Sequence, residues 1–245
     1  MSNIYSDEQL CDLQTGGLFI IQKNKGFKFG IDAVLLSDFA KSQKSKCTLD
    51  LCTGTGIVPL LLSDKTNTPK IYGIEIQKDI CDMAKRSVTY NNLDERITIT
   101  EGDVKDAVSM FGKGTFDKIT CNPPYTEVGR GIKNSADTLL ISRHEILVTL
   151  EDIIRITSEL LVPQGGFFMV HRPSRIADIM CLMRQYGIEP KTIRFVSPDA
   201  NKAPNLVLVH GVKNGGKELK FLPNIFVYDT NGEYSSEINK IYNRR

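Results

Sequence analysis

From residue 47 onward, short hydrophobic runs alternate with segments whose hydrophobic residues recur at helical spacing. The helical segments are Gly56–Ser63, Lys78–Asn91, Leu150–Leu161 and Ser174–Tyr186. The short runs predict seven buried strands, at Cys47–Cys52, Lys70–Glu75, Arg96–Thr100, Phe116–Cys121, Gly166–His171, Thr192–Val196 and Leu206–Val212. Such alternation predicts an α/β fold with a doubly wound, mostly parallel sheet. The last two strands have no helix between them, so we expect them to pair as an antiparallel hairpin at the edge.

Two further segments flank this pattern. Gly17–Leu36 predicts a small hairpin that leads into a helix, and Phe221–Tyr234 predicts a second hairpin with Asp229-Thr-Asn-Gly232 as its turn. We therefore divide the chain into an N-terminal extension (1–45), an α/β domain (46–215) and a C-terminal hairpin or tail packed on that domain (216–245).

The composition excludes several classes of protein but does not indicate a function. The 245 residues are 41% hydrophobic and 24% charged, which suits one soluble domain with a sizeable core. No run approaches the roughly 18–20 apolar residues that span a bilayer, and the polar N-terminus lacks the pattern of a secretion signal. The six cysteines form no C-x-x-C pair, so we expect reduced thiols in a cytoplasmic protein and no metal site. The sequence leaves the oligomeric state open, and we favour a monomer. The net charge of +2 neither requires nor excludes nucleic acid.

A glycine turn, Asp50-Leu-Cys-Thr-Gly54-Thr-Gly56, connects the first predicted strand to a helix. Glycines let the backbone approach a ligand, and the helix N-terminus offers free amide groups. The third glycine of the dinucleotide-binding pattern G-x-G-x-x-G is absent after Gly56. Taken alone, the motif is also consistent with a simple tight turn.

Acidic residues follow the next two strands in order. Glu75 ends the second strand, where a carboxylate can bind both ribose hydroxyls of an adenosine, and Asp103 follows the third, where it can accept from an adenine amino group. The neighbouring Thr53, Ile76 and Val104 complete our candidate cofactor contacts. This set predicts an adenosine-containing cofactor, and NAD remains open at this point.

Asn122-Pro-Pro-Tyr125 directly follows the fourth strand. The two prolines fix the backbone and remove two donors, so the Asn122 side chain and the Pro123 carbonyl can each accept a hydrogen from one planar amino group. Tyr125 offers a face on which a base can stack. The predicted chemistry is methyl transfer to a weakly nucleophilic nitrogen, which depends on positioning more than on a strong base.

With this motif the chain resembles the Rossmann-like amino-methyltransferases, whose cofactor is S-adenosyl-L-methionine; the resemblance is what excludes NAD. Within them it is similar to the bacterial tRNA1(Val) adenine-37 N6-methyltransferase family. The shared segments are Phe27–Leu36, Asp50–Gly56, Gly73–Ile76, Asn91–Leu93, Arg96–Ile97, Asn122–Tyr125, Arg143–Glu145, Phe226–Tyr228 and Gly232–Tyr234. The chain departs from many relatives at Cys52, where they have glycine.

The resemblance implies roles for particular residues. It implies a seven-stranded Rossmann-like methyltransferase fold and an RNA substrate, with tRNA as the expected species and N6-methyladenosine as the product. It places Phe29 and Asp32 over the methionine end of the cofactor, and Asn122 beside both cofactor and substrate. For the RNA we name Arg143, His144 and Arg172 as candidate contacts; the reading of His144 as a base is disfavoured, because the chemistry needs no histidine.

Other functions remain open. A guanine-N2 methyltransferase of ribosomal RNA and a glutamine-N5 methyltransferase of release factors share the Asn-Pro-Pro-Tyr chemistry. About 45 residues precede the first core strand, which leaves little room for a helical domain that recognises release factors or for the target-recognition domain of a DNA methyltransferase. A catalytically silent protein that binds cofactor or RNA is the non-enzyme alternative.

Overall fold

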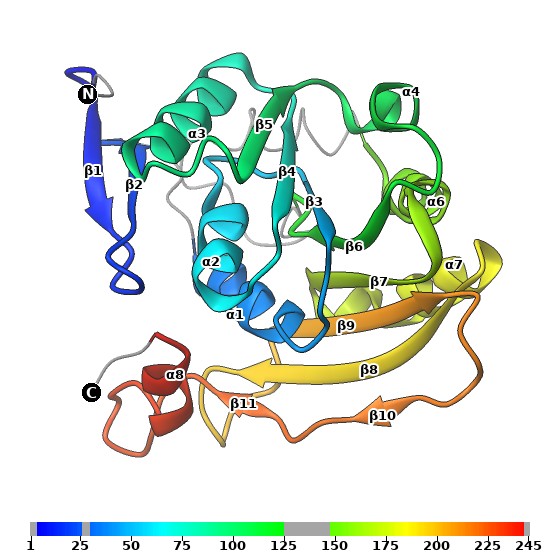
Figure 1. The fold of residues 1–245 in the computed structure, drawn as a ribbon. Coiled ribbons are helices and arrows are strands. Elements are labelled where there is room, and N and C mark those ends of the chain that lie inside the picture. The colour runs from blue at the N-terminus through cyan, green and yellow to red at the C-terminus, as the bar shows by residue number, and fades with distance from the viewer. Residues whose placement is uncertain (1–3, 26–29, 125–147, 243–245) are drawn as a thin grey trace.

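The computed structural model describes residues 4–25, 30–124 and 148–242, and within them a nine-stranded sheet forms the centre of the molecule (Figure 1). The order across the sheet is β10-β8-β9-β7-β6-β3-β4-β5, and β11 also pairs with β8. The strands are β3 (Cys47–Leu51), β4 (Lys70–Glu75), β5 (Ile97–Glu101), β6 (Phe116–Cys121), β7 (Leu161–His171), β8 (Ile188–Ser197), β9 (Leu206–Lys213), β10 (Lys220–Phe221) and β11 (Ile225–Phe226).

All strand pairs in this sheet are parallel except those made by β9, which lies antiparallel between β7 and β8. The carboxyl ends of β3, β4, β5, β6, β7 and β8 therefore meet at one edge of the sheet. We call this edge the mouth. The predicted α/β class and the mostly parallel sheet are confirmed.

Helices cover both faces of the sheet. They are α1 (Ile31–Ala40), α2 (Ile57–Lys65), α3 (Lys78–Tyr90), α4 (Ala107–Phe111), α6 (Leu150–Leu160), α7 (Ile176–Gln185) and α8 (Ser236–Ile241), with the short 3-10 turns η1 (Val104–Asp106) and η2 (Pro173–Arg175). Buried residues of α1, α2, α3 and α8 belong to one hydrophobic core, and those of α4, α6 and α7 belong to the other. The sheet is thus the middle of three layers, as its strands, buried on both faces, require.

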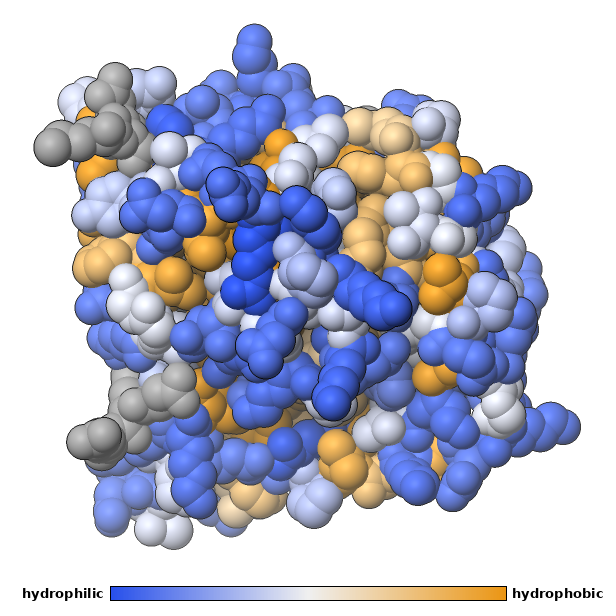
Figure 2. Space-filling model, in the orientation of Figure 1, coloured by the Kyte–Doolittle hydropathy of each residue, from blue (hydrophilic) through white to orange (hydrophobic). Residues whose placement is uncertain are grey.

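The outer face seen in Figure 2 is mostly hydrophilic, with hydrophobic residues in scattered groups. Among the described helices, none combines the length and the apolar character needed to cross a bilayer.

Two predicted strand starts differ from the structure by more than one residue. Strand β7 begins at Leu161, directly after α6, and so includes Pro163, although we expected proline and glycine to separate helix from strand. Its pairing with β6 shifts register between Phe116 and Lys118, and such an irregularity is where a sheet tolerates proline. Strand β8 starts at Ile188 rather than Thr192.

The C-terminal segment also pairs differently from the prediction. The expected hairpin exists only as a bridge between Tyr228 and Tyr234, around a turn in which Gly232 has φ +81°. The residues before it, β10 and β11, pair with β8 in parallel. The predicted hairpin β8–β9 is therefore present, but its outer strand is covered. Covering an edge strand satisfies its free backbone groups.

The N-terminal hairpin consists of β1 (Glu8–Asp12) and β2 (Phe19–Lys23), and it starts earlier than predicted. It lies against α3 (Figure 1). Asn91 both donates to and accepts from the backbone of Phe19, and the amide of Ile21 donates to the Ser87 hydroxyl. These bonds fix the hairpin that precedes Asp32.

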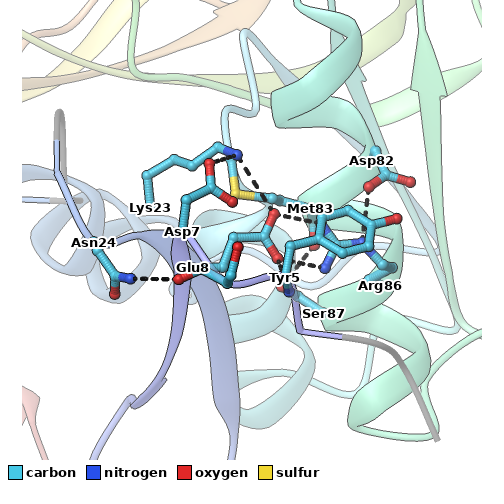
Figure 3. Close-up of polar contacts among 10 residues, drawn as sticks. Tyr5, Asp7, Glu8, Lys23, Asn24, Asp82, Met83, Arg86 and Ser87 are labelled. Carbon is cyan, nitrogen blue, oxygen red and sulfur yellow. Dashed lines mark hydrogen bonds and ion pairs between the residues drawn. The ribbon is translucent and has the colours of Figure 1, made fainter.

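An ion pair reinforces this contact (Figure 3). Arg86 donates through both terminal nitrogens to the two carboxylate oxygens of Glu8, at 2.7 Å each, and the Glu8 side chain is only 1% exposed. The hydrogen bonds from Arg86 hold the pKa of Glu8 below its usual value. Asp82 accepts from Arg86 as well, and the Tyr5 ring lies 4.3 Å below the guanidinium. We call Tyr5, Glu8, Asp82 and Arg86 the hairpin clamp.

Candidate active site at the mouth of the sheet

The glycine turn leaves β3 in a backbone conformation that suits residues without a side chain. Cys52, Gly54 and Gly56 have φ values of +56°, +57° and +83°. Cys52 thus adopts the left-handed conformation that glycine favours. A side chain at Gly54 would meet no atom within 4 Å, so the space beyond its Cα is open. A bound group can approach the backbone at this point.

Glu75 is the carboxylate that organises the turn. Its oxygen Oε2 accepts from the amide of Gly54, and Oε1 accepts from the amide of Gln77, both at 2.9 Å. The side chain is held at the end of β4, and the residue is 5% exposed. Each carboxylate oxygen keeps further lone pairs for another donor. A ribose diol is a ligand of the right kind, because its two hydroxyls can donate to such a carboxylate.

Asp103 and its neighbours continue the mouth at the end of β5. One carboxylate oxygen of Asp103 accepts from the amide of Lys105 at 2.9 Å and caps η1, and Val104 is buried. Ile76 follows Glu75 and is 38% exposed, so part of its apolar side chain is open to solvent at the end of β4. Met110 is 41% exposed, and its sulfur covers Gly102. The sequence did not suggest Met110, because the five-residue α4 is too short to show a helical period.

Asp50 lies beneath the glycine turn and is 1% exposed. The Thr120 hydroxyl donates to Asp50 at 2.6 Å, whereas the buried Thr53 hydroxyl has no hydrogen-bond partner among the described residues. Burial raises the pKa of Asp50 from 3.8 to about 7, the bond from Thr120 opposes this shift, and the charge of Glu75 adds to it. Asp50 was predicted as a cofactor contact, and this role stays a prediction. Its depth places it beneath the turn, where it accepts from Thr120, a residue outside the predicted set.

Asn122 and Pro123 follow β6 immediately, and β6 pairs with β3, so they emerge beside the glycine turn. Pro123 is buried, whereas Asn122 and Pro124 are half-buried. The structure thus brings the predicted acceptors and the predicted cofactor carboxylates to one edge. Tyr125, Phe29, Arg143 and His144 lie outside the described residues.

Asp32 and Arg172 are the remaining predicted site residues. Asp32 lies in the first turn of α1, where its carboxylate accepts from the amide of Ala33 at 2.9 Å. Arg172 follows β7, next to β6 in the sheet, and one of its terminal nitrogens is 3.4 Å from the carbonyl oxygen of Asn205. No group of three or more His, Cys, Asp or Glu side chains in the described parts of the chain is arranged to hold a metal ion.

Comparison with known proteins identifies the family to which this chain belongs. The family model described as "Methyltransferase small domain" matches residues 28–178. The chain is 28% identical over 227 residues to a protein of Porphyromonas gingivalis named tRNA1(Val) (adenine(37)-N6)-methyltransferase, covering 89% of this chain and 88% of that one. It is 27% identical over 183 residues to a protein of the same name from Aeromonas salmonicida, covering 74% and 75%.

Solved structures share the fold. A predicted O-methyltransferase from Agrobacterium tumefaciens superposes with a TM-score of 0.68 at 20% identity, covering 86% of this chain and 95% of that one. A 16S rRNA N2 methyltransferase from T. thermophilus, solved with AdoMet and guanosine, gives a TM-score of 0.60 at 17% identity, covering 86% and 52%. At these identities the likeness establishes the architecture.

Proposed function

Because the chain belongs to the methyltransferase small domain family, we propose that it transfers a methyl group from S-adenosyl-L-methionine to the exocyclic N6 of adenine-37 in a tRNA. The observation that carries this proposal is the position of Asn122-Pro123 at the end of β6, at the same edge as Glu75 and Asp103. The names of the relatives from two bacteria support the choice of base and RNA.

The cofactor side uses the residues at the ends of β3, β4 and β5. The open space beyond Gly54 fits a group that lies against the backbone, and Glu75 fits the ribose. Asp103 and the amide group beside it at Val104 suit an adenine edge, with Ile76 packing on the ring. When bound, S-adenosyl-L-methionine would supply the electrophilic methyl group, whose bond to sulfur breaks as the nitrogen takes it, and S-adenosylhomocysteine would leave. Thr53, Gly56 and Asp50 shape the turn, and Asp32 and Phe29 complete the set at the start of α1.

The substrate side positions the nitrogen. The side-chain oxygen of Asn122 and the carbonyl of Pro123 accept the two amino hydrogens of the adenine. This arrangement turns the nitrogen lone pair, which is otherwise delocalised into the ring, towards the methyl group. Once the new N–C bond has formed, the nitrogen is strongly acidic, and its proton passes to water through these same acceptors. Tyr125 provides the face on which the base stacks.

The experiment is transfer of radiolabelled methyl to tRNA, ribosomal RNA, DNA and protein from a strain that lacks the gene, followed by mass spectrometry of the digested products. N6-methyladenosine in a single tRNA species is the expected result. Label in ribosomal RNA as N2-methylguanosine, or in a release factor, would retain the chemistry and replace the target. Absence of label, together with cofactor binding by calorimetry, would indicate a catalytically silent protein.

A further inference from the structure

Three tyrosine rings form a nearly parallel stack in the C-terminal segment. The ring centres of Tyr228 and Tyr234 are 5.5 Å apart with 9° between the planes, and those of Tyr234 and Tyr242 are 6.1 Å apart with 15° between the planes. Tyr234 is thus the middle ring. Tyr234 and Tyr242 are half-buried, whereas Tyr228 is 43% exposed. The stack therefore ends at Tyr228 in an aromatic ring that is open to solvent. We call these three residues the tyrosine stack.

The backbone around Tyr228 is fixed by hydrogen bonds. The amide of Tyr228 donates to the carbonyl of Pro198 at 2.8 Å, just beyond β8. The next residue, Asp229, closes the turn, because its carboxylate accepts from the amides of Asn231 and Glu233. A ring held in this way loses little conformational freedom when a flat ligand stacks on it.

A second aromatic side chain faces outward in the same segment. Ile225 and Val227 are buried, whereas Phe226 is 38% exposed. Buried and exposed residues alternate from Ile225 to Tyr228, so Phe226 and Tyr228 both face outward. The exposed aromatic surface is thus larger than one ring, and its inner neighbours anchor it to the core.

This surface lies at the mouth. Ile225 pairs with Val196, and Phe226 with Ser197, the last residue of β8. From β6, the order across the sheet is β7, β9, β8 and then β11. Four steps of about 4.8 Å across the sheet separate β6 from β11. Because Cys121 is level with Ile193, Tyr228 also lies about five residues further along the strands than Asn122. The two residues are therefore about 25 Å apart.

We propose that Tyr228, with Phe226 beside it, is a stacking platform for an unpaired base of the RNA substrate, about 25 Å from the methylated adenine. This inference rests on the proposed function, since it concerns how the same RNA is held. Single-stranded loops are recognised through bases that stack on aromatic side chains. Arg172, at the end of β7, lies between Asn122 and this platform and suits the connecting phosphates.

The test measures the affinity of the full chain, with S-adenosylhomocysteine present, for two RNAs: the anticodon stem-loop of tRNA1(Val), and a trinucleotide centred on the target adenine. Tyr228→Ala is expected to weaken stem-loop binding by roughly 5- to 50-fold and to leave trinucleotide binding unchanged. Tyr228→Phe keeps the ring and should bind as the wild type does. Tyr90→Ala is the matched control, because Tyr90 is 39% exposed but ends α3, which leads from the end of β4 back to the start of β5, at the edge opposite to the mouth.

Two outcomes would overturn the platform. One is unchanged stem-loop affinity in a folded Tyr228→Ala variant; the other is an equal loss in Tyr90→Ala. If Tyr228→Ala fails to fold, 2-aminopurine placed in turn at each loop position of the stem-loop gives the answer with the wild type. Quenching at a loop position other than the target adenine supports the platform, and its absence at every such position contradicts it. A wild-type protein that binds the stem-loop but methylates no RNA would refute the proposed function, while the binding comparison would still decide the platform.

Discussion

The two sides of β6 present different chemistry at the same edge of one sheet. On the side of β3, β4 and β5, the mouth is lined by carboxylates that are buried or bonded to backbone amides, as at Asp50 and Glu75. On the side of β7, β8 and β11, it carries Arg172 and the exposed rings of Phe226 and Tyr228. Fixed acceptors select a small polar ligand, whereas exposed rings suit a larger ligand that brings its own flat surfaces. Asn122 stands where the two sides meet.

The largest expected effect concerns Asp50. Its unfolded-state pKa is near 3.8 and its folded-state pKa is about 7, so between these values the folded state holds a proton that the unfolded state has lost. Stability therefore falls as pH rises from about 4 to about 7, by about 4 kcal/mol in all. Asp50→Asn removes this dependence. Chemical denaturation measures the free energy of unfolding of both proteins. The value for the variant, relative to that of the wild type, should rise by about 4 kcal/mol between about pH 4 and about pH 8.

A difference between variant and wild type that does not change with pH would show that Asp50 is not the group that titrates. S-adenosyl-L-methionine carries positive charge, so it should stabilise the wild type more at high pH than at low pH, and this pH dependence should be lost in Asp50→Asn.

The second effect concerns the boundary between the two sides. Asn122→Ala should lower kcat by about 100-fold or more while leaving cofactor affinity within about twofold, because the lost hydrogen bond acts on the substrate nitrogen. Single-turnover kinetics and calorimetry measure the two quantities. If cofactor affinity fell in step with kcat, Asn122 would belong to the cofactor side.

The third effect is confined to the cofactor side. Glu75→Gln should weaken cofactor binding by about 30-fold, since it replaces charge-assisted hydrogen bonds with weaker ones and places an amide donor against a backbone donor. RNA affinity should not change. Glu101→Gln is the matched control, because Glu101 is the register partner of Glu75 at the end of β5 but is exposed. Equal effects at the two positions would mean that net charge, rather than the fixed carboxylate, binds the cofactor.

The smallest expected effect concerns the ion pairs that attach the N-terminal hairpin and the C-terminal segment to the α/β domain. Arg86 binds a carboxylate that is 1% exposed, whereas Arg194 pairs with Glu237, whose side chain is 42% exposed, and donates to the carbonyl of Pro223. We expect Arg86→Met to lower the free energy of unfolding by about 1–3 kcal/mol, and Arg194→Met by less than about 1 kcal/mol. Urea denaturation would contradict the comparison if the two losses were equal.

Much of this architecture could be predicted from the sequence. The bounds of β4 and β6 were predicted to the residue, because each is a hydrophobic run that ends at a polar or proline position. The order of Gly54, Glu75, Asp103 and Asn122 along the chain predicted their meeting at one edge, since parallel strands share their carboxyl ends. Their individual roles towards cofactor and substrate stay predictions.

Other features of the structure could not be predicted, because no local sequence pattern marks them. The pairing of β10 and β11 with β8 involves two residues each, too few to show a period. Thr120 is one of several polar residues in β6, and only the pairing with β3 reveals that it donates to Asp50. The tyrosine stack joins residues six and eight positions apart through a turn and a short helix, so no repeating pattern marks it.

The position of β9 has a consequence for how the chain folds. β9 is made after β8, yet it lies between β7 and β8. During synthesis, therefore, β8 cannot take its final position in the sheet until β9 has left the ribosome. After that, β10 and β11 must still pair with β8 and cover its edge. Until that moment the strand that leads to Arg172 has a free edge. We expect the last assembly step to be slow and to expose that edge, so that chaperone binding should concentrate on chains that end shortly before residue 206.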